Sequence, residues 1–355
     1  MKTTTKLFTK RLKWCMTRVM LMLAAAIGCS ACDSMIYDDE GDCDPHYFVR
    51  FVFDMNMLRT DAFATQVNSV DLYVFNAQTG EFVKHYFEKG EALASGNYRM
   101  PLDITPGDYE LIAWCGLADN KNHFTVPQAI TKPSDLICTL TRSYDDTGAY
   151  SDANLHALFH GSVSVNFPAT EGEHVALVKL TKDTNNINLS LQHKAGTLNP
   201  DDFEVVMSDN NGLMAHDNSL MNDEFIEYRP WILRNGKVDI QSETTTYADG
   251  INDADEESEE ANFLIAEIST ARLMFNHDMR INIFDKKQGK VVFSIPLVQW
   301  ALLLRSANHA DMGEQEYLDR QDEYNLMVFL DGHESWIAMS IYINGWHIIN
   351  QDSEL

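Results

Sequence analysis

The segment Trp336-Ile-Ala-Met-Ser-Ile-Tyr-Ile343-Asn344-Gly345-Trp346-His-Ile-Ile349 carries the strongest short-range strand signal of the chain. Apolar residues fill both arms. Between them, Asn-Gly is the pair that favours the tight turn of an antiparallel hairpin. The segment therefore predicts a β-hairpin close to the C-terminus.

Similar patterns extend back along the chain and predict a fold built from strands. Two more hairpins are expected, each with a five-residue loop that ends in glycine, Asn76–Gly80 and Asp285–Gly289. Alternating or apolar runs predict other strands at Tyr47–Met55, Tyr109–Cys115, Ser162–Phe167, His174–Leu180, Ile187–Leu191, Phe203–Met207, Phe263–Phe275 and Tyr324–Leu330. A short helix is expected at Leu297–Arg305. Many short strands with little helical periodicity predict an all-β fold, and the two similar loops suggest two related β-sandwiches.

The first 31 residues have the layout of an export signal. Six basic residues precede the apolar run Val19–Ile27, and small residues with two cysteines follow it. This run is too short to cross a bilayer as a helix, which takes roughly 20 residues. A cysteine after small residues indicates a bacterial lipoprotein signal, in which the thiol takes up diacylglycerol and holds the protein at a membrane surface.

Two cysteines compete for this role. We expect Cys32 to be the lipidated residue, with Cys29 as the alternative and an ordinary cleaved signal as a third reading. The Cys-x-x-Cys spacing of the pair also occurs in redox and metal sites, but those sites need a folded context. Apart from this covalent N-terminal lipid, the sequence predicts no cofactor.

The composition restricts the partners. The formal net charge is −26, and loss of the six basic residues ahead of Cys32 would take it to −32. Such a chain repels nucleic acid, so we expect no nucleic-acid partner. The acidic segment from Cys32 to Pro45 is interpreted as a tether between lipid and domain.

Cysteine usage agrees with export. Beyond Cys32, the remaining thiols are Cys43, Cys115 and Cys138, so at most one disulfide forms among them, and the pairing is left open.

A search for chemistry predicts no enzyme, no catalytic residue and no metal site. The chain lacks the nucleophile elbow, the zinc-protease motif, the phosphate loop and the dinucleotide fingerprint. His156 and His160 are four residues apart, but a zinc site needs a third ligand, and packing is the simpler reading. Five tryptophans that could line a sugar site are more simply interpreted as core or rim: Trp114, Trp231, Trp300, Trp336 and Trp346.

Several segments together form a familiar set. They are Cys32–Cys43, Asp54–Met57, Leu72–Phe75, Thr105–Gly116, Leu180–Asn186, Tyr228–Trp231, Gln315–Arg320 and Ile343–Trp346. With them, the chain from Cys32 to Leu355 resembles the FimB-type fimbrial anchor lipoproteins of Bacteroidales. The resemblance implies two transthyretin-like Greek-key sandwiches with short helical insertions. It also implies a surface-exposed lipoprotein of the outer membrane that holds a type V fimbria and limits its length.

The resemblance also implies partners and a mechanism. Fimbrial pilins would be bound by β-strand exchange, in which an added strand gains main-chain hydrogen bonds. We expect the last strands to supply or border this contact through Trp336, Ile337, Met339, Ile341, Ile343, Trp346 and Ile348. The alternative is that these strands only close the second sandwich. A fimbrial tip or surface adhesin and a surface glycan-binding or glycan-degrading lipoprotein remain as other functions.

These readings give an expected domain order. Residues 1–31 are the signal peptide and residues 32–45 the acidic tether. Residues 46–175 form the N-terminal sandwich and residues 176–355 the C-terminal sandwich, with the boundary placed between Ala169 and Asn185.

Overall fold

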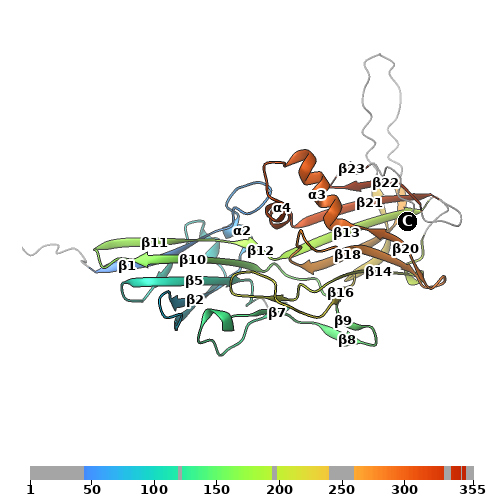
Figure 1. The fold of residues 1–355 in the computed structure, drawn as a ribbon. Helices are drawn as coiled ribbons and strands as arrows, with labels where there is room; N and C mark the ends of the chain where they lie inside the picture. Colours follow the sequence, from blue (N-terminus) through green and yellow to red (C-terminus); the bar gives the residue numbers. More distant parts are fainter. Residues whose placement is uncertain are drawn as a thin grey trace, which may run out of the picture. The chain divides into compact units, whose positions relative to one another are not determined.

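The computed structural model describes residues 44–118, 122–193, 198–239, 260–331, 337–344 and 346–348 (Figure 1). These residues fall into two compact units. The larger unit holds residues 47–168 and 174 onward, and the smaller holds 44–46 with 169–173. Strands dominate, with few helices, so the predicted all-β fold is confirmed.

The first sandwich consists of a three-stranded and a five-stranded sheet, with strand orders β11-β1-β4 and β12-β10-β5-β2-β3. The strands are β1 (Pro45–Val52), β2 (Ser69–Asn76), β3 (Phe82–Lys89), β4 (Met100–Leu102), β5 (Gly107–Cys115), β10 (Phe159–Phe167), β11 (Gly172–Lys179) and β12 (Thr181–Lys182). Val49 of β1, Leu111 of β5 and Val178 of β11 meet in one buried apolar cluster. Alternating side chains thus form the core between the two sheets.

The five-stranded sheet is buried on both faces along β2. Val70, Leu72 and Val74 belong to the core of the first sandwich. Tyr73 and Phe75 point to the opposite face and join a second core. This two-sided burial explains why Val70–Phe75 is an almost continuous apolar run instead of an alternating one.

A small sheet of order β15-β7-β6 contributes to that second core. Its strands are β6 (Phe124–Thr125), β7 (Cys138–Leu140) and β15 (Leu213–Met214). Phe124 and Met214 share one buried cluster with Trp114 of the five-stranded sheet. The same cluster continues without interruption into the second sandwich.

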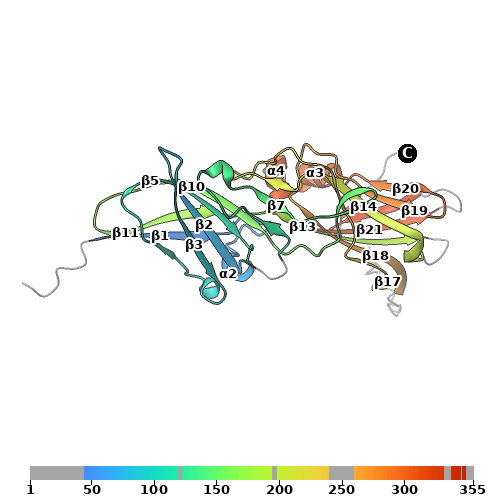
Figure 2. The ribbon, with the colours of Figure 1, turned by 90° about the horizontal axis from the view of Figure 1, so that it is seen from below.

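The second sandwich pairs two six-stranded sheets, β17-β18-β13-β21-β22-β23 and β20-β19-β14-β16-β9-β8 (Figure 2). The strands are β8 (Ser143–Asp145), β9 (Gly148–Ser151), β13 (Thr184–His193), β14 (Phe203–Asp209), β16 (Ile226–Tyr228), β17 (Ile232–Asp239), β18 (Glu260–Ala271), β19 (Ile281–Asp285), β20 (Lys290–Ile295), β21 (Glu323–Asp331), β22 (Ile337–Ile343) and β23 (Trp346–Ile348). Leu189 of β13 and Val205 of β14 both belong to its buried core.

Parts of the first 175 residues pair with strands of the later chain. β9 lies parallel to β16, with Ala149 opposite Ile226, and β7 pairs with β15, with Cys138 opposite Met214. The segment from Cys138 to Ser151 therefore takes part in sheets completed by later residues. The sequence-based boundary after residue 175 stays a prediction.

The predicted hairpins are all present. β2 pairs with β3 and β19 with β20, and Gly80 and Gly289 adopt the positive φ that each loop requires. β22 and β23 form the third hairpin, with Ile343 opposite Trp346.

Helices are short and few. The expected helix is α3 (Leu297–Asn308), which extends three residues beyond Arg305. α2 (Phe63–Gln66), α4 (Glu314–Arg320) and three 3-10 turns, Leu93–Ser95, Pro133–Asp135 and Pro200–Asp202, were not predicted. α4 has only seven residues, too few to show a helical apolar period, although its Tyr317 and Leu318 are buried. In the part of the chain that the structure describes, no helix has the length and apolar character to cross a membrane.

Candidate functional site

The predicted contact strands lie at one end of a six-stranded sheet. Among the described residues, β23 is the terminal strand of this sheet and pairs with β22 alone, whereas β22 lies between β21 and β23. A terminal strand leaves one row of main-chain donors and acceptors available for another strand. The hairpin thus places the terminal described strand of this sheet within the segment for which the sequence predicts the contact.

The turn of this hairpin is fixed to the start of β21. Asn344 has a φ of 49°, the left-handed conformation that asparagine tolerates in tight turns. Its backbone N–H donates to the Asn325 carbonyl at 2.8 Å, and its Oδ1 accepts from the Asn325 N–H at 2.8 Å. Side chain and backbone of one turn residue therefore hold the hairpin in register with the neighbouring strand.

The structure divides the predicted contact residues into groups. Ile343 is fully buried and belongs to the core of the second sandwich. Ile337, Met339 and Ile341 lie on β22, and Trp346 and Ile348 lie on β23. Trp336 lies outside the described residues. The pilin contact of this set stays a prediction.

The cysteines are distributed differently. Cys29, Cys32 and Cys43 lie outside the described residues. Cys115 and Cys138 are buried free thiols, and burial raises the pKa of each thiol well above its usual value. Both thiols therefore stay protonated and unreactive in the folded chain.

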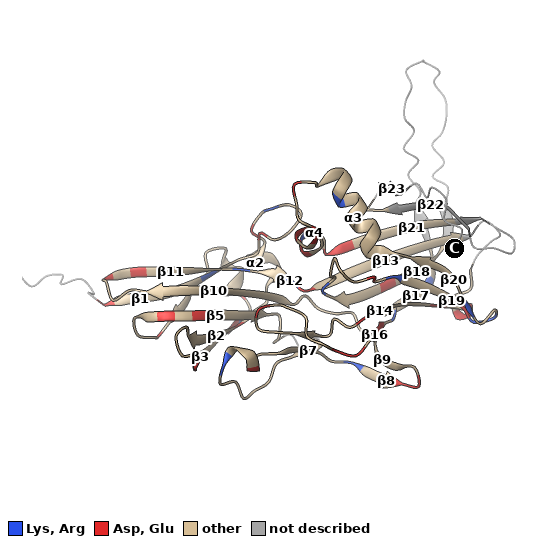
Figure 3. Cartoon of the chain, viewed as in Figure 1, with Lys and Arg blue, Asp and Glu red and all other residues tan. Residues whose placement is uncertain are grey.

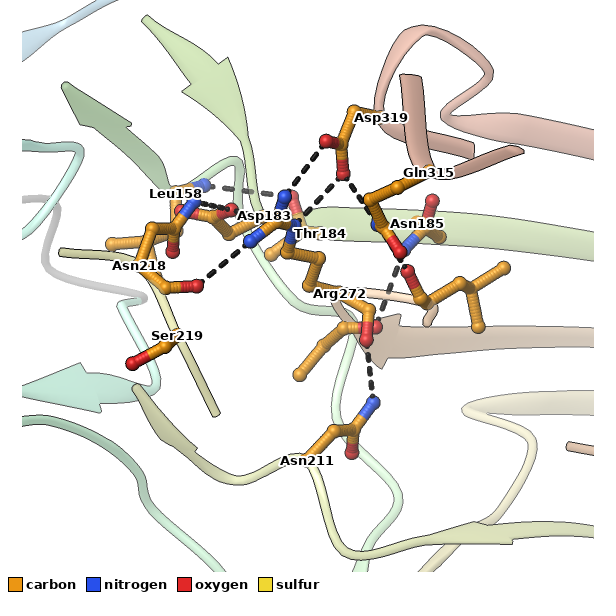
Figure 4. A network of polar contacts seen from close by, with 12 residues as sticks. Leu158, Asp183, Thr184, Asn185, Asn211, Asn218, Ser219, Arg272, Gln315 and Asp319 are labelled. Carbon is orange, nitrogen blue, oxygen red and sulfur yellow. Dashed lines mark hydrogen bonds and ion pairs between the residues drawn. The ribbon is translucent and has the colours of Figure 1, made fainter. Parts of the chain in front are cut away.

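A buried polar cluster lies where the chain leaves the first sandwich and enters the second. We call it the junction cluster and define it as Asp183, Asn218, Arg272, Gln315 and Asp319 (Figure 4). Asp183 occupies the single position between β12 and β13, and its backbone N–H donates to the Leu158 carbonyl at 2.8 Å. It is completely buried. The crossing of the chain between two sheets therefore coincides with a buried carboxyl group.

Arg272 is the centre of the junction cluster. Its Nε and Nη2 donate to the two carboxylate oxygens of Asp319 at 2.8 and 2.7 Å, and its Nη1 donates to the Asn218 carbonyl at 2.7 Å. Asn218 in turn donates from Nδ2 to Asp183 Oδ1 at 2.9 Å. Gln315, one helical turn before Asp319, donates to Asp319 Oδ1 at 2.8 Å. This fork-shaped pairing is the strong, orientation-specific form of an arginine–carboxylate contact.

Burial dominates the electrostatics of Asp183. Desolvation raises the pKa of this carboxyl to about 7, against the opposing effects of the Arg272 charge and the Asn218 hydrogen bond. The guanidinium lies 3.8 Å from Asp183, farther than from Asp319, to which it donates directly. The junction cluster thus has one carboxylate that is strongly paired and one that is close to gaining a proton at neutral pH.

Helix α4, which carries Gln315 and Asp319, also contacts the first sandwich. Arg320 of α4 donates from Nη1 to the carbonyls of Asp54 and Asn56 at 2.9 and 3.1 Å. Together with Asp183 of the junction cluster, Arg320, Asp54 and Asn56 bring together three of the segments that carried the family resemblance: Asp54–Met57, Leu180–Asn186 and Gln315–Arg320. The sequence marked the segments but did not reveal that they meet, because no periodic pattern joins residues so far apart.

Of the remaining candidates, His160 and Trp114 pack against each other in the buried interior. His160 is buried on β10, its ring centroid lies 4.6 Å from that of Trp114, and its Nε2 lies 2.8 Å from the His216 carbonyl. Burial lowers the pKa of His160 to about 4, so the ring is neutral at neutral pH. Trp114 is fully buried, whereas Trp231 is 37% exposed. Among the described residues, no three His, Cys, Asp or Glu side chains are grouped as metal ligands would be.

Comparison with known proteins identifies the family. Residues 39–352 match the family of fimbrillin-A associated anchor proteins Mfa1 and Mfa2. The chain belongs to this family. The resemblance to fimbrial anchor proteins is thereby confirmed, and the protein is an anchoring subunit associated with a fimbrium at the cell surface.

Relatives of the Mfa2 family cover nearly the whole chain. The minor fimbrium anchoring subunit Mfa2 of Porphyromonas gingivalis is 19% identical over 339 residues, 92% of this chain and 93% of its own. A candidate adhesin of Bacteroides thetaiotaomicron is 30% identical with a TM-score of 0.72, and a candidate polysaccharide-binding protein of that organism is 29% identical with a TM-score of 0.71. Each structure covers 87% of this chain and 99% of its own. The solved structure of P. gingivalis Mfa2, at 16% identity and a TM-score of 0.61, shares the fold.

Proposed function

We propose that this member of the Mfa2 family is the basal, lipid-anchored subunit of a type V fimbria at the bacterial outer membrane. The observation that carries the proposal is the family match, which spans residues 39–352. The export signal and the cysteines that precede this range supply the second element, an attachment point for lipid. The subunit would hold the pilus at the cell and limit its length.

The lipid would be attached at Cys32. A single acyl chain gives only marginal membrane binding, and stable anchoring takes two signals. A diacylglyceryl thioether provides two chains on one residue, which meets this requirement. The acidic residues after Cys32 keep the connecting segment solvated between lipid and fold.

Substitution of the two candidate cysteines tests the anchor. We expect Cys32→Ala to remove acyl chains from the N-terminal peptide and to move the protein from the membrane fraction to the soluble fraction. Cys29→Ala is the matched control and should leave both readouts unchanged. Acylation that persists in Cys32→Ala and disappears in Cys29→Ala would move the site to Cys29; a wild-type protein without acyl chains would refute the anchor.

The pilin would be bound at the open edge of the second sandwich. Among the described residues, β23 has a strand neighbour on one side only, so an incoming strand can extend the sheet through main-chain hydrogen bonds. The contact residues proposed from the sequence, Trp336 to Ile348, cover β22 and β23. β22 is itself paired on both sides, which leaves β23 as the strand that an added segment would meet.

Truncation separates this contact from simple closure of the sandwich. We expect deletion of Gly345–Leu355, which removes β23, to release fimbriae into the medium while the protein stays at the membrane. Deletion of Asp352–Leu355, which lies beyond β23, is the control and should leave fimbriae attached. Normal attachment after the longer deletion would reject this edge as the pilin site. Cross-linking on intact cells followed by mass spectrometry would identify the pilin.

A surface adhesin is the second candidate function. Two structural relatives near 30% identity are described as a candidate adhesin and a candidate polysaccharide-binding protein. Acidic residues lie on β5 and β11 (Figure 3), and the net charge is −26, so a bound glycan is more simply neutral or cationic than anionic. Immunogold labelling at the base or the tip of fimbriae, together with a glycan array, distinguishes this function from anchoring.

A further inference from the structure

We propose that a pocket beside the five-stranded sheet of the first sandwich binds a small amphiphilic cation, that is, a protonated amine on an apolar or aromatic body. The pocket has a volume of about 280 Å³. Its lining consists of one carboxylate, one hydroxyl and five apolar side chains: Asp71, Phe87, Leu117, Ala118, Phe124, Thr125 and Val126. We call it the Asp71 pocket. It is distinct from the pilin contact and independent of the lipid.

Sheet register places one wall of the Asp71 pocket. Asp71 of β2 lies directly opposite Phe87 of β3, and on its other side it faces Trp114 of β5. Asp71 therefore has a large aromatic residue as its cross-strand neighbour on each side, and its side chain is 13% exposed. Phe87 remains 47% exposed, so its ring is available at the pocket mouth.

The opposite wall is held by an asparagine. Asn122 donates from Nδ2 to the carbonyls of Leu117 and Phe124 at 2.8 and 2.6 Å, and its Oδ1 accepts from the Phe124 N–H at 2.9 Å. The Ala118 N–H donates to Ser69 Oγ at 3.2 Å, which fastens this wall to the start of β2. Hydrogen bonds thus preform the pocket before a ligand enters, as in most small-molecule sites.

The two oxygens of the Asp71 carboxylate differ in their hydrogen-bond partners. His85 Nε2 lies 3.0 Å from Oδ1, within hydrogen-bond distance. Oδ2 is buried and has no hydrogen-bond partner among the described residues. Within those residues, the ion-pair partner of Asp71 is His85, and neither lysine nor arginine pairs with it. A buried charge of this kind is costly unless a donor or a counter-charge reaches it.

An amine on an apolar body satisfies each of these features. Its ammonium group supplies a positive charge and hydrogen-bond donors beside the Asp71 carboxylate. A cation beside an exposed aromatic ring such as Phe87 gains a further cation–π attraction. The apolar body replaces water against Leu117 and Val126. Anionic ligands are disfavoured by Asp71 itself and by the net charge of −26.

Binding of matched probes tests the charge requirement. Phenethylamine, phenethyl alcohol and phenylacetate share one apolar body and differ in charge. By calorimetry or ligand-observed NMR on the purified folded protein, phenethylamine should bind at least tenfold more tightly than the alcohol, and phenylacetate should not bind. Equal binding of amine and alcohol, or no amine binding at millimolar concentration, would overturn the proposal. Binding of a neutral sugar in preference to the amine would also overturn it.

Variants locate the binding. Asp71→Asn keeps the size of the side chain and removes its charge, so amine affinity should fall about tenfold or more while alcohol affinity changes little. Asp146→Asn removes the same charge from an exposed turn and is the matched control. If Asp71→Asn does not fold, Thr125→Lys brings a tethered ammonium to the exposed side of the pocket and should block the amine. Unchanged amine binding in either folded pocket variant would reject the site.

Discussion

The junction cluster and the β23 edge differ in whether their polar groups have hydrogen-bond partners within the fold. At the junction, Arg272 directly follows β18. The other members come from the crossing between β12 and β13, from a loop and from α4, and most hydrogen bonds of the cluster are satisfied inside the fold. At the edge, β23 has a sheet partner on one side only within the described part of the chain. The first region is largely buried, with side-chain exposures of 13% for Arg272 and 9% for Asp319, whereas the second leaves main-chain groups of the described strand without a sheet partner. We infer that rigidity and binding are assigned to different places in this anchoring subunit.

The largest effect is expected from Arg272→Met. The substitution removes the only cation of the junction cluster and leaves Asp319, whose side chain is 9% exposed, without its fork-shaped pairing. Loss of one partner of a buried ion pair typically costs about 3–5 kcal/mol. We therefore expect the free energy of unfolding to fall by roughly that amount in urea titrations followed by tryptophan fluorescence.

An exposed ion pair provides the control for this prediction. Lys287 pairs with Asp202, and the Lys287 side chain is 71% exposed. Lys287→Met should change the free energy of unfolding by less than about 1 kcal/mol, because solvent screens the pair. Similar losses for the two substitutions would show that the junction cluster is no more important to the fold than a surface contact.

The comparison also shows what the sequence could predict. Period-two patterns and glycine-closed loops identified the hairpins around Gly80 and Gly289, because strand pairing across a short loop is local information. The junction cluster could not be found in this way, since Asp183 and Asp319 are brought together only by the fold. Helix α4 was missed for a related reason: Tyr317 and Leu318 are buried, but seven residues show no period.

At the candidate site, the sequence predicted the hairpin but did not show that Ile343 is buried in the core. Ile343 was grouped with the predicted contact residues because it continues an apolar strand, yet it is completely buried. An apolar alternating strand has the same pattern whether its face meets a core or a partner. The Asp71 pocket gave no signal at all, because Asp71 is a single acid inside an apolar run.

A substitution at Ile343 sharpens the distinction between core and edge. Ile343→Ala removes buried methyl groups opposite Leu326, and such losses cost roughly 2–5 kcal/mol. We expect a fall of this size in urea unfolding, whereas Val83→Ala, at a side chain that is 42% exposed, should stay within about 0.5 kcal/mol. A stable Ile343→Ala protein that nevertheless sheds fimbriae would instead assign Ile343 to the partner contact.

The smallest effect, and the most specific, is expected in the pH dependence caused by Asp183. Its pKa is about 7 in the folded state and about 3.9 in an unfolded chain. Between these values the folded state holds a proton that the unfolded state has lost, so this carboxyl makes stability fall as pH rises from about 4 to about 7. Asp183→Asn should change stability little near the acidic end of this range, where the native carboxyl is also neutral, and should remove the downward contribution above it. Urea unfolding at several pH values measures the difference between wild type and variant as a slope.

Asp145→Asn gives a control of opposite sign, because its hydrogen bonds to Arg229 and Thr147 lower the pKa of Asp145, so that its contribution is lost as pH falls below about 4. If the difference in the free energy of unfolding between wild type and Asp183→Asn does not change across this pH range, Arg272 keeps Asp183 ionised. The junction cluster would then hold two paired carboxylates instead of one.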